Sequence, residues 1–321
     1  MRCHSFVLVL AAFLVFALAL GVAACGTAEN LPGGSDSTST SAPGPGTTST
    51  SAPASSSTTL PAGSISHPTG ATDVILRLAT GGGLVPIEVN DTLIPEFTLY
   101  GDGRIIVPGP TTMQYPGAAL PNLQTTVVSE AVIQAILSAA KEAKLFQNGV
   151  DYGHPGVADV GSTTVTVNAE GTTYKSEIYA LGFGGGGSGS VSAEQQQARA
   201  VINDLRNKLS DPTNFSAPPP AWETYDLTAL KVFSRQAPAA SDTSSTDVKP
   251  NNLPWPLADL GTAGTEVANA QGLRQLVVTG DDLATLKALL PQATEITLWQ
   301  SGNADYNLWL RPLLPDEAAA L

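Results

Sequence analysis

The chain from residue 73 to residue 210 alternates apolar and polar positions in the pattern of strands joined by tight turns. "DVILRLAT" and "PEFTLYGDGRIIVP" show the period of two that is typical of half-buried strands. Residues 101–103 (Gly-Asp-Gly) tolerate positive φ angles, so we expect a hairpin turn there. A second hairpin is predicted in "TTVTVNAEGTTYKSEIYAL", with its turn at residues 169–171.

Two helical patterns belong to the same region. After Ser129, a suitable N-cap, apolar residues recur every three or four positions and define one face: Val132, Ile133, Ile136, Leu137 and Ala140. A second helix is predicted from about Ala193 to Leu209, because Ser192 and Gln195 fit a capping box. Its buried stripe is expected to comprise Ala198, Val201, Ile202, Leu205 and Leu209.

The proline-rich linker 211–221 separates this region from a second one, 222–321, which reads as strand, polar insertion, strand, helix and hairpin. Hairpins without regular alternation of strand and helix favour an α+β fold, with antiparallel sheets and helices packed on one face. Four residues of the first region recur 150 positions later, which raises the hypothesis of two related βαββ units. They are Leu123, Val127, Val128 and Ser129, matched by Leu273, Val277, Val278 and Thr279.

Residues 25–72 contain almost no large apolar side chain and consist mainly of serine, threonine, proline and glycine. Such a segment cannot bury enough apolar surface to fold, so we predict a disordered tether. About 47 residues of this composition have an r.m.s. reach on the order of 40 Å. Because an unpacked tether contributes no burial, removal of residues 26–70 is expected to leave the melting temperature nearly unchanged.

Residues 1–24 have the features of an export signal, with Arg2 ahead of an uncharged apolar stretch. The stretch ends at "VAACG", residues 22–26, which resembles the lipobox of bacterial lipoproteins, the mark of a type II signal peptide. The resemblance implies cleavage before Cys25 and a diacylglycerol on the Cys25 sulfur. It also implies a protein anchored by lipid to the extracytoplasmic face of the cell membrane. Two acyl chains are sufficient for stable anchoring.

An ordinary signal peptide with an incidental cysteine and an uncleaved signal anchor are the alternatives, since the apolar stretch is close to the length that spans a bilayer. Cysteine usage favours the lipoprotein. Only Cys3 and Cys25 occur, and Cys3 would leave with the signal, so the mature chain has no partner for an internal disulfide.

The charge balance excludes some partners. Fifteen basic residues stand against 28 acidic ones, so a basic surface for nucleic acid or for anionic lipid headgroups is not expected. No spacing of Cys, His and acidic residues matches a zinc or calcium site. We therefore predict no metal and no cofactor.

Two short motifs match known functional motifs, but the surrounding sequence disfavours both functions. "GFGGGG" (182–187) matches the glycine pattern of dinucleotide-binding turns, but its preceding strand belongs to a hairpin, so we interpret it as a connector. Ser138 and Lys141 have the spacing that resembles the nucleophile and lysine of serine acyltransferases. They lie on the polar side of the predicted helix, however, and no KTG motif occurs.

The sequence gives equally little support for catalysis by histidine or aspartate. His154, with Asp151 and Asp159 nearby, stands among turn-forming residues and is interpreted as a surface-loop histidine. Asp281 and Asp282 suit the first turn of a helix, where carboxylates meet the positive end of the helix dipole. We predict no catalytic residue.

Trp299 and Trp309 are the candidates for a ligand-binding surface. If "EITLWQ" and "YNLWLR" pair around a loop at residues 301–305, both rings point to one face, beside a cross-strand pair of Glu295 and Arg311. Exposed aromatic faces suit sugar rings and protein partners. The alternative is that Trp222 or "PWPL" covers this face as part of a core.

The leading interpretation of the sequence is a non-enzymatic binding or interaction module of the cell envelope, with a protein, peptide or glycan as partner. The alternatives are an envelope hydrolase or acyltransferase, with His154 or Ser138 as participant, and a structural spacer. "LYGDGRI" and "RPLLPDE" resemble segments of uncharacterised envelope proteins from high-GC Gram-positive bacteria, which implies no site residue.

Overall fold

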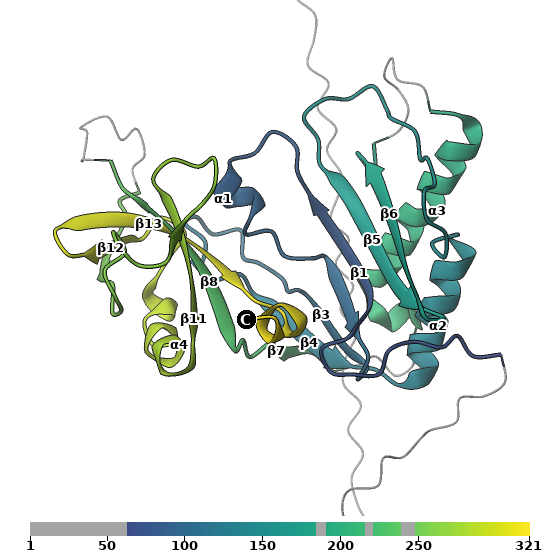
Figure 1. The fold of residues 1–321 in the computed structure, drawn as a ribbon, viewed down its shortest axis with the longest axis horizontal. Helices are drawn as coiled ribbons and strands as arrows, with labels where there is room; N and C mark the ends of the chain where they lie inside the picture. The colour runs from purple at the N-terminus through teal and green to yellow at the C-terminus, as the bar shows by residue number, and fades with distance from the viewer. Residues whose placement is uncertain (1–62, 184–190, 216–220, 239–247) are drawn as a thin grey trace, which may run out of the picture. The chain divides into compact units, whose positions relative to one another are not determined.

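The computed structural model describes residues 63–183, 191–215, 221–238 and 248–321. The predicted signal peptide 1–24, Cys25, the predicted tether up to residue 62 and residues 184–187 of the glycine-rich motif lie outside the described residues. Figure 1 shows two β-sheets with helices packed beside them, which confirms the α+β class.

Within the described residues, sheet 1 has seven strands in the order β6-β5-β1-β2-β3-β4-β7, and every neighbouring pair is antiparallel. Both predicted hairpins form: Gly103 has φ +84° after β2, and Glu170 and Gly171 make a two-residue turn with φ of +53° and +72°. The strands are β1 (Val74–Gly81), β2 (Phe97–Tyr100), β3 (Arg104–Pro108), β4 (Leu123–Val127), β5 (Ser162–Ala169), β6 (Thr172–Tyr179) and β7 (Glu223–Thr224).

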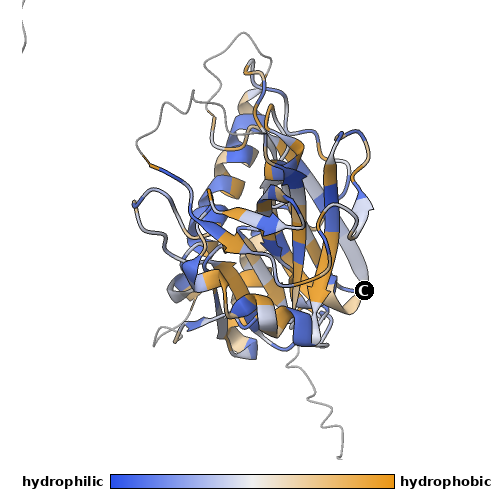
Figure 2. Ribbon diagram, turned by 90° about the vertical axis from the view of Figure 1, so that its left-hand side faces the viewer, coloured by the Kyte–Doolittle hydropathy of each residue, from blue (hydrophilic) through white to orange (hydrophobic). Residues whose placement is uncertain are grey.

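Sheet 2 has six strands in the described part of the chain, in the order β10-β11-β8-β13-β12-β9. Its neighbours are antiparallel except for β12 and β9, which run parallel. The strands are β8 (Ala229–Gln236), β9 (Asn252–Pro254), β10 (Thr265–Glu266), β11 (Leu273–Thr279), β12 (Leu298–Ser301) and β13 (Ala304–Pro312). Figure 2 shows apolar and polar residues alternating along the strands, as the period of two requires.

Helices α2 (Glu130–Glu142) and α3 (Ala193–Leu209) lie on the same side of sheet 1 (Figure 1). The predicted face of α2 is buried in full, and Ser192 and Gln195 form the expected capping box of α3. With the inner face of sheet 1 these helices enclose the first core. The shorter helices are α1 (Ile87–Asn90), α4 (Gly280–Lys287), α5 (Pro315–Ala319) and two 3₁₀ turns, η1 (Pro212–Phe215) and η2 (Leu290–Gln292).

A second core is built by both regions of the chain. Tyr100 and Ile106, which belong to strands of sheet 1, pack in one cluster with Val232, Leu286 and Trp299 of the second region. Burial of apolar surface contributes about 25 cal/mol per Å², so this shared cluster couples the stability of the two regions. Region 222–321 is therefore a subdomain whose core is completed by region 73–210.

The folded part begins earlier than the composition predicts. Ile65 belongs to the first core, and its backbone N–H and C=O bond the side-chain amide of Gln134 at 2.8 and 2.9 Å. The His67 imidazole is 2% exposed and lies 3.1 Å from the Glu130 carboxylate. The predicted extension of the tether to residue 72 is wrong for residues 63–72, because one isoleucine and two polar contacts dock a segment of polar composition. We therefore no longer expect the melting temperature to stay unchanged when residues 26–70 are removed.

The two predicted βαββ units share an order of elements and differ in strand arrangement. β4-α2-β5-β6 and β11-α4-β12-β13 follow one another in the chain as expected. In sheet 1 the hairpin joins β1 through its first strand, β5, whereas in sheet 2 the hairpin joins β8 through its second strand, β13. The two hairpins therefore join their sheets through different strands. For this reason the structure does not support a duplication.

Candidate functional site

Hairpin β12–β13 places the two candidate tryptophans on opposite faces of sheet 2. Trp299 pairs with Tyr306 around a two-residue turn at 302–303. The predicted loop 301–305 would have paired Trp299 with Asn307. Because a shift of pairing by one residue moves a side chain to the other face, the predicted shared face of Trp299 and Trp309 is wrong.

Trp299 is a core residue, 1% exposed, and the Trp255 ring meets it edge-on with centroids 5.7 Å apart. The alternative in which "PWPL" covers this ring is therefore confirmed. Trp309 is half-buried against Phe233, with the Arg235 guanidinium carbon 5.9 Å from its ring centroid. The two rings form no joint aromatic surface for a ligand.

The predicted cross-strand pair of Glu295 and Arg311 does not form. Arg311 donates to both carboxylate oxygens of Glu317 at 2.9 and 2.7 Å, and Glu295 accepts the N–H of Gly117 at 3.0 Å. Strand β12 begins only at Leu298, so Glu295 precedes the ladder in which the pair was expected.

The two residues of the acyltransferase-like spacing, Ser138 and Lys141, form no hydrogen bond with each other in the described part of the chain. Ser138 is exposed on α2, whereas the Lys141 ammonium donates to Glu170 at 2.8 Å and lies over the Phe146 ring. The observed partner of the lysine is thus a surface carboxylate and not the serine hydroxyl that an acyltransferase pair would require. The surface interpretation of this motif agrees with the structure.

His154 is an exposed loop residue whose ring stacks on Tyr179, with centroids 4.0 Å apart. Asp151 accepts hydrogen bonds from the N–H of Gly153 and the side chain of Gln195. These contacts explain the loop without a catalytic role. The acidic residues 281–282 occupy the first turn of α4, as predicted.

An apolar hollow of about 590 Å³ opens where the two regions meet, and we name it the junction groove. Its lining comes from the loop before β4, from β7 and the residues after it, from the end of α4 with η2, and from the end of β13. The apolar wall includes Leu120, Pro121, Leu227, Leu290, Pro291 and Pro312. A concave apolar lining with a few polar groups is typical of ligand sites.

Charged groups stand at the rim of the junction groove. The Lys287 ammonium donates to Asp226 at 2.6 Å and to the carbonyl of Leu227 at 2.8 Å. The Asp226 side chain is 90% exposed, so this ion pair contributes at most about 1 kcal/mol to stability and can be exchanged for a ligand group. Tyr225 donates its hydroxyl to the carbonyl of Leu313 at 3.1 Å, and burial raises the pKa of Tyr225 to about 12. The groove therefore offers an apolar interior, a neutral phenol and an exchangeable ion pair.

A second polar cluster ties α5 to sheet 1. Arg77 donates to both carboxylate oxygens of Asp316 at 3.0 and 2.7 Å, and the Tyr100 hydroxyl donates to the same carboxylate at 2.7 Å. Burial opposes both charges, but the hydrogen bonds prevail, so the pKa of Asp316 lies below its ordinary value and that of Arg77 above it. Burial and the bond to Asp316 raise the pKa of Tyr100 far above its ordinary range. These pKa shifts follow from contacts among the three residues themselves, as expected for a cluster with a structural role. We name Arg77, Tyr100 and Asp316 the clasp.

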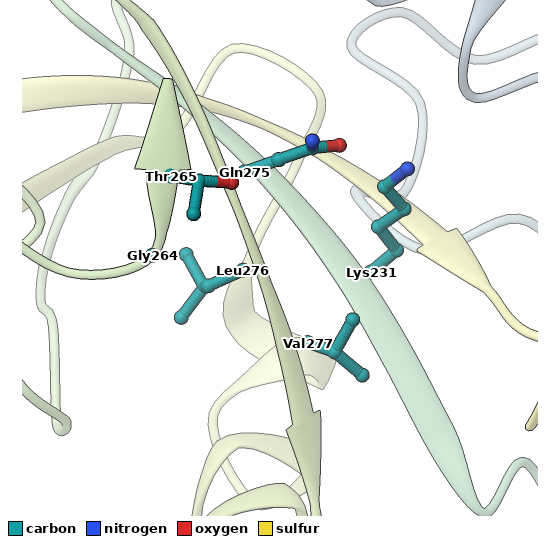
Figure 3. Close-up of a pocket in the computed structure, with 6 residues that line it drawn as sticks. All are labelled: Lys231, Gly264, Thr265, Gln275, Leu276 and Val277. Carbon is teal, nitrogen blue, oxygen red and sulfur yellow. The ribbon is translucent and has the colours of Figure 1, made fainter. Parts of the chain in front are cut away.

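A further hollow of about 570 Å³ lies at the edge of sheet 2, where β10 and β11 separate (Figure 3), and we name it the edge pocket. Its lining is Lys231, Gly264, Thr265, Gln275, Leu276 and Val277. Consecutive residues of a strand point to opposite faces, so a pocket lined by three consecutive residues of β11 follows the edge of that strand.

Sequence reasoning missed the junction groove because its walls come from distant parts of the chain. The available signal was local: each of Pro121, Pro291 and Pro312 adjoins a leucine, the first before β4, the second in η2 and the third at the end of β13. Proline marks element boundaries, but the pattern does not show which boundaries meet in space.

No family model, curated protein or solved structure matches the chain. In the part that the structure describes, no helix is sufficiently long and apolar to cross a membrane. Nor do the described residues bring three His, Cys, Asp or Glu side chains together as a metal site.

Proposed function

We propose that this chain is a lipid-anchored, extracytoplasmic binding module of the bacterial envelope, and that it holds its ligand in the junction groove. The lipobox-like segment around Cys25 supports the anchor. The apolar lining of the groove is the observation that carries the binding function, because leucines and prolines left beside an open hollow gain from a ligand that removes them from water.

The lining favours one class among the partners that the sequence leaves open. Aliphatic and proline side chains suit an apolar side chain of a peptide or protein, and Lys287 and Asp226 can meet a polar group beside it. A glycan requires many hydrogen-bonding groups and aromatic platforms, and the tryptophans that would supply a platform are packed elsewhere. The proposed partner is therefore an envelope protein or peptide that inserts an apolar residue.

The experiment uses 8-anilinonaphthalene-1-sulfonate as a probe, because it combines an apolar body with an anionic group. We expect saturable binding to the full chain, with the fluorescence increase following a single site. Leu120 is half-buried in the groove wall, so Leu120→Asp is expected to weaken the probe at least about tenfold, since a buried carboxylate costs more than about 1.4 kcal/mol.

The matched control is Leu93→Asp, because Leu93 is 41% exposed and lies outside the groove. This variant should bind the probe like the parent chain. Urea unfolding of both variants checks that they remain folded, because the probe also stains disordered states. Equal binding by Leu120→Asp and the parent chain would remove the groove as the binding site.

A further inference from the structure

Strand β11 is flanked on its outer edge by β10 along two residues only. Thr265 pairs with Gln275 and Glu266 with Arg274, whereas the pairing of β11 with β8 on the other side continues to Thr279. From Leu276 onward no strand of the described chain lies beside the outer edge of β11. The edge pocket begins here and reaches across one face of β11 to Lys231 of β8 (Figure 3).

The outward backbone groups follow from the alternation of hydrogen bonds along a strand. Val267 donates its N–H to the carbonyl of Leu273 at 2.9 Å, so Leu273 faces the outer side of β11. Every second residue has the same direction. Val277 therefore presents its N–H and C=O outward, and Thr279 its N–H, and neither residue has a bond on that side within the described residues.

The backbone conformation before β10 leaves the outer edge of β11 open. Gly264 has φ +66°, and a Cβ at this position would collide with the carbonyl of Gln275, so the turn that ends the pairing of β10 with β11 requires glycine. The Arg274 guanidinium holds this turn by donating to the carbonyls of residues 262, 263 and 264 at 2.9 Å each. Strand β10 is thus prevented from continuing along β11.

The long outer edge of sheet 1 shows the contrasting arrangement. The Asn148 side chain donates to the carbonyl of Thr173 at 3.2 Å and accepts the N–H of Lys175 at 2.7 Å. The Arg199 guanidinium donates to the carbonyl of Tyr179 at 2.9 Å. Side chains therefore bond part of the edge of β6, at residues 173, 175 and 179, and such cover hinders the pairing of an edge strand. The edge of β11 lacks such cover at Val277, which is 41% exposed.

The charge at the edge pocket indicates the chemistry of its occupant. Lys231 is the charged residue of the lining and pairs directly across from Val277 on the neighbouring strand. Its ammonium lies 4.9 Å from the Phe233 ring centroid and takes part in none of the ion pairs of the described residues. In a chain of net charge −13, an ammonium without a carboxylate partner beside open backbone groups is complementary to an acidic side chain.

We propose that the outer edge of β11 binds an extended, acidic peptide segment, which adds a strand to sheet 2 beside Val277. Backbone hydrogen bonds to Val277 and Thr279 would supply binding, and a glutamate or aspartate on the face shared by Val277 and Lys231 would supply selectivity. This site is separate from the junction groove and does not depend on the function proposed for it.

The probe is a blocked octapeptide of alternating threonine and valine with one central glutamate, titrated into the ¹⁵N-labelled full chain. We expect the amide signals of Val277 and Thr279 to shift and their hydrogen exchange to slow by at least about tenfold at saturation, since both amides become hydrogen-bonded. A peptide with an N-methyl group on every residue keeps its side chains but loses its backbone donors on both edges. It should not bind.

Charge exchange tests the selectivity. A peptide with lysine in place of glutamate should bind about two- to fivefold more weakly, the range of an exposed ion pair. In Lys231→Glu this preference should reverse, and in Lys231→Gln it should vanish, which keeps the test open if the first variant folds poorly. Lys175→Glu is the matched control, because it changes the net charge equally on exposed β6 and should leave the preference unchanged.

Three kinds of result would overturn the proposal. One is the absence of shifts at Val277 and Thr279 with any peptide at millimolar concentration. Another is equal binding of the N-methylated peptide, which would exclude strand addition, or a glutamate preference that persists in Lys231→Glu, which would exclude acidic selectivity. The third is concentration-dependent dimerisation in sedimentation with the same amides protected, which would make a second copy of the chain the occupant.

Discussion

Arg77 in β1 and Asp316 in α5 are joined by two hydrogen bonds of 3.0 and 2.7 Å, although 239 positions separate them in the chain. The pair fastens the C-terminal helix to the sheet that the first region forms. Tyr100 donates a third hydrogen bond to the same carboxylate at 2.7 Å. The clasp therefore links the first and last elements of the fold, β1 and α5.

The pH dependence of this clasp is the first prediction. Asp316 has a folded-state pKa below its ordinary value, so its ionised form contributes stability that is present above pH about 4 and is lost as pH falls through the lower, folded pKa. Asp316→Asn is expected to lower the free energy of unfolding by about 1.5 to 3 kcal/mol at pH 7. Urea unfolding from pH 7 down to pH 3 measures the difference, which should shrink below pH about 4 as the parent carboxylate becomes protonated.

Asp282→Asn is the control for this series, because Asp282 is exposed in the first turn of α4 and should change stability by less than about 1 kcal/mol. A gap between Asp316→Asn and the parent chain that stays constant down to pH 3 would contradict the ionic origin of the clasp.

The second prediction concerns the tryptophans. Trp299→Ala should lower the free energy of unfolding by about 3 to 5 kcal/mol, because the ring is 1% exposed and packs on Trp255. Trp309→Ala should cost less, about 1 to 2 kcal/mol, because its ring is half-buried beside Arg235. Chemical unfolding of both variants measures these losses. Equal, small losses at both positions would restore the exposed aromatic face that the register excludes.

The register around Trp299 shows why sequence reasoning failed there and succeeded at α2. The buried face of α2 follows from periodicity within 13 residues, so the pattern alone identifies it. The faces of a hairpin depend on the length of its turn. Gly302, with φ +59°, begins a two-residue turn, a signal that was available in the sequence. Choosing a loop of five residues instead moved every side chain of β12 to the wrong face.

Other features could not be predicted from local pattern at all. The docking of Ile65 depends on the first core and on Gln134 of α2, which come together only in the assembled fold. The junction groove and the edge pocket depend on where strands stop pairing, which is set by contacts between residues such as Gly264 and Gln275. Periodicity describes the interior of an element well, whereas sites here arise at the ends of elements.

The third prediction follows from Ile65 and Gln134. A chain that begins at residue 71 should be less stable than one that begins at residue 63, because it loses the burial of Ile65, worth about 1.5 to 3 kcal/mol, and two hydrogen bonds to Gln134. Thermal and urea unfolding of the two chains give the comparison. Gln134→Ala should destabilise the longer chain and leave the shorter one nearly unchanged. Equal stability of the two chains would mean that residues 63–70 do not contribute to the fold.

The last prediction tests the anchor. If Cys25 receives the diacylglycerol, Cys25→Ser should move the protein from the membrane fraction to the soluble fraction, because a hydroxyl does not replace the thiolate nucleophile in lipid transfer. Cys3→Ser is the matched control and should stay with the membrane, since residue 3 belongs to the segment that cleavage removes. Fractionation with immunoblotting measures both variants, and the mass of the mature N-terminal peptide identifies the modification. Retention of Cys25→Ser in the membrane at the parent level would instead support an uncleaved apolar helix, and in that case the unmodified residues 1–24 should be found on the mature chain.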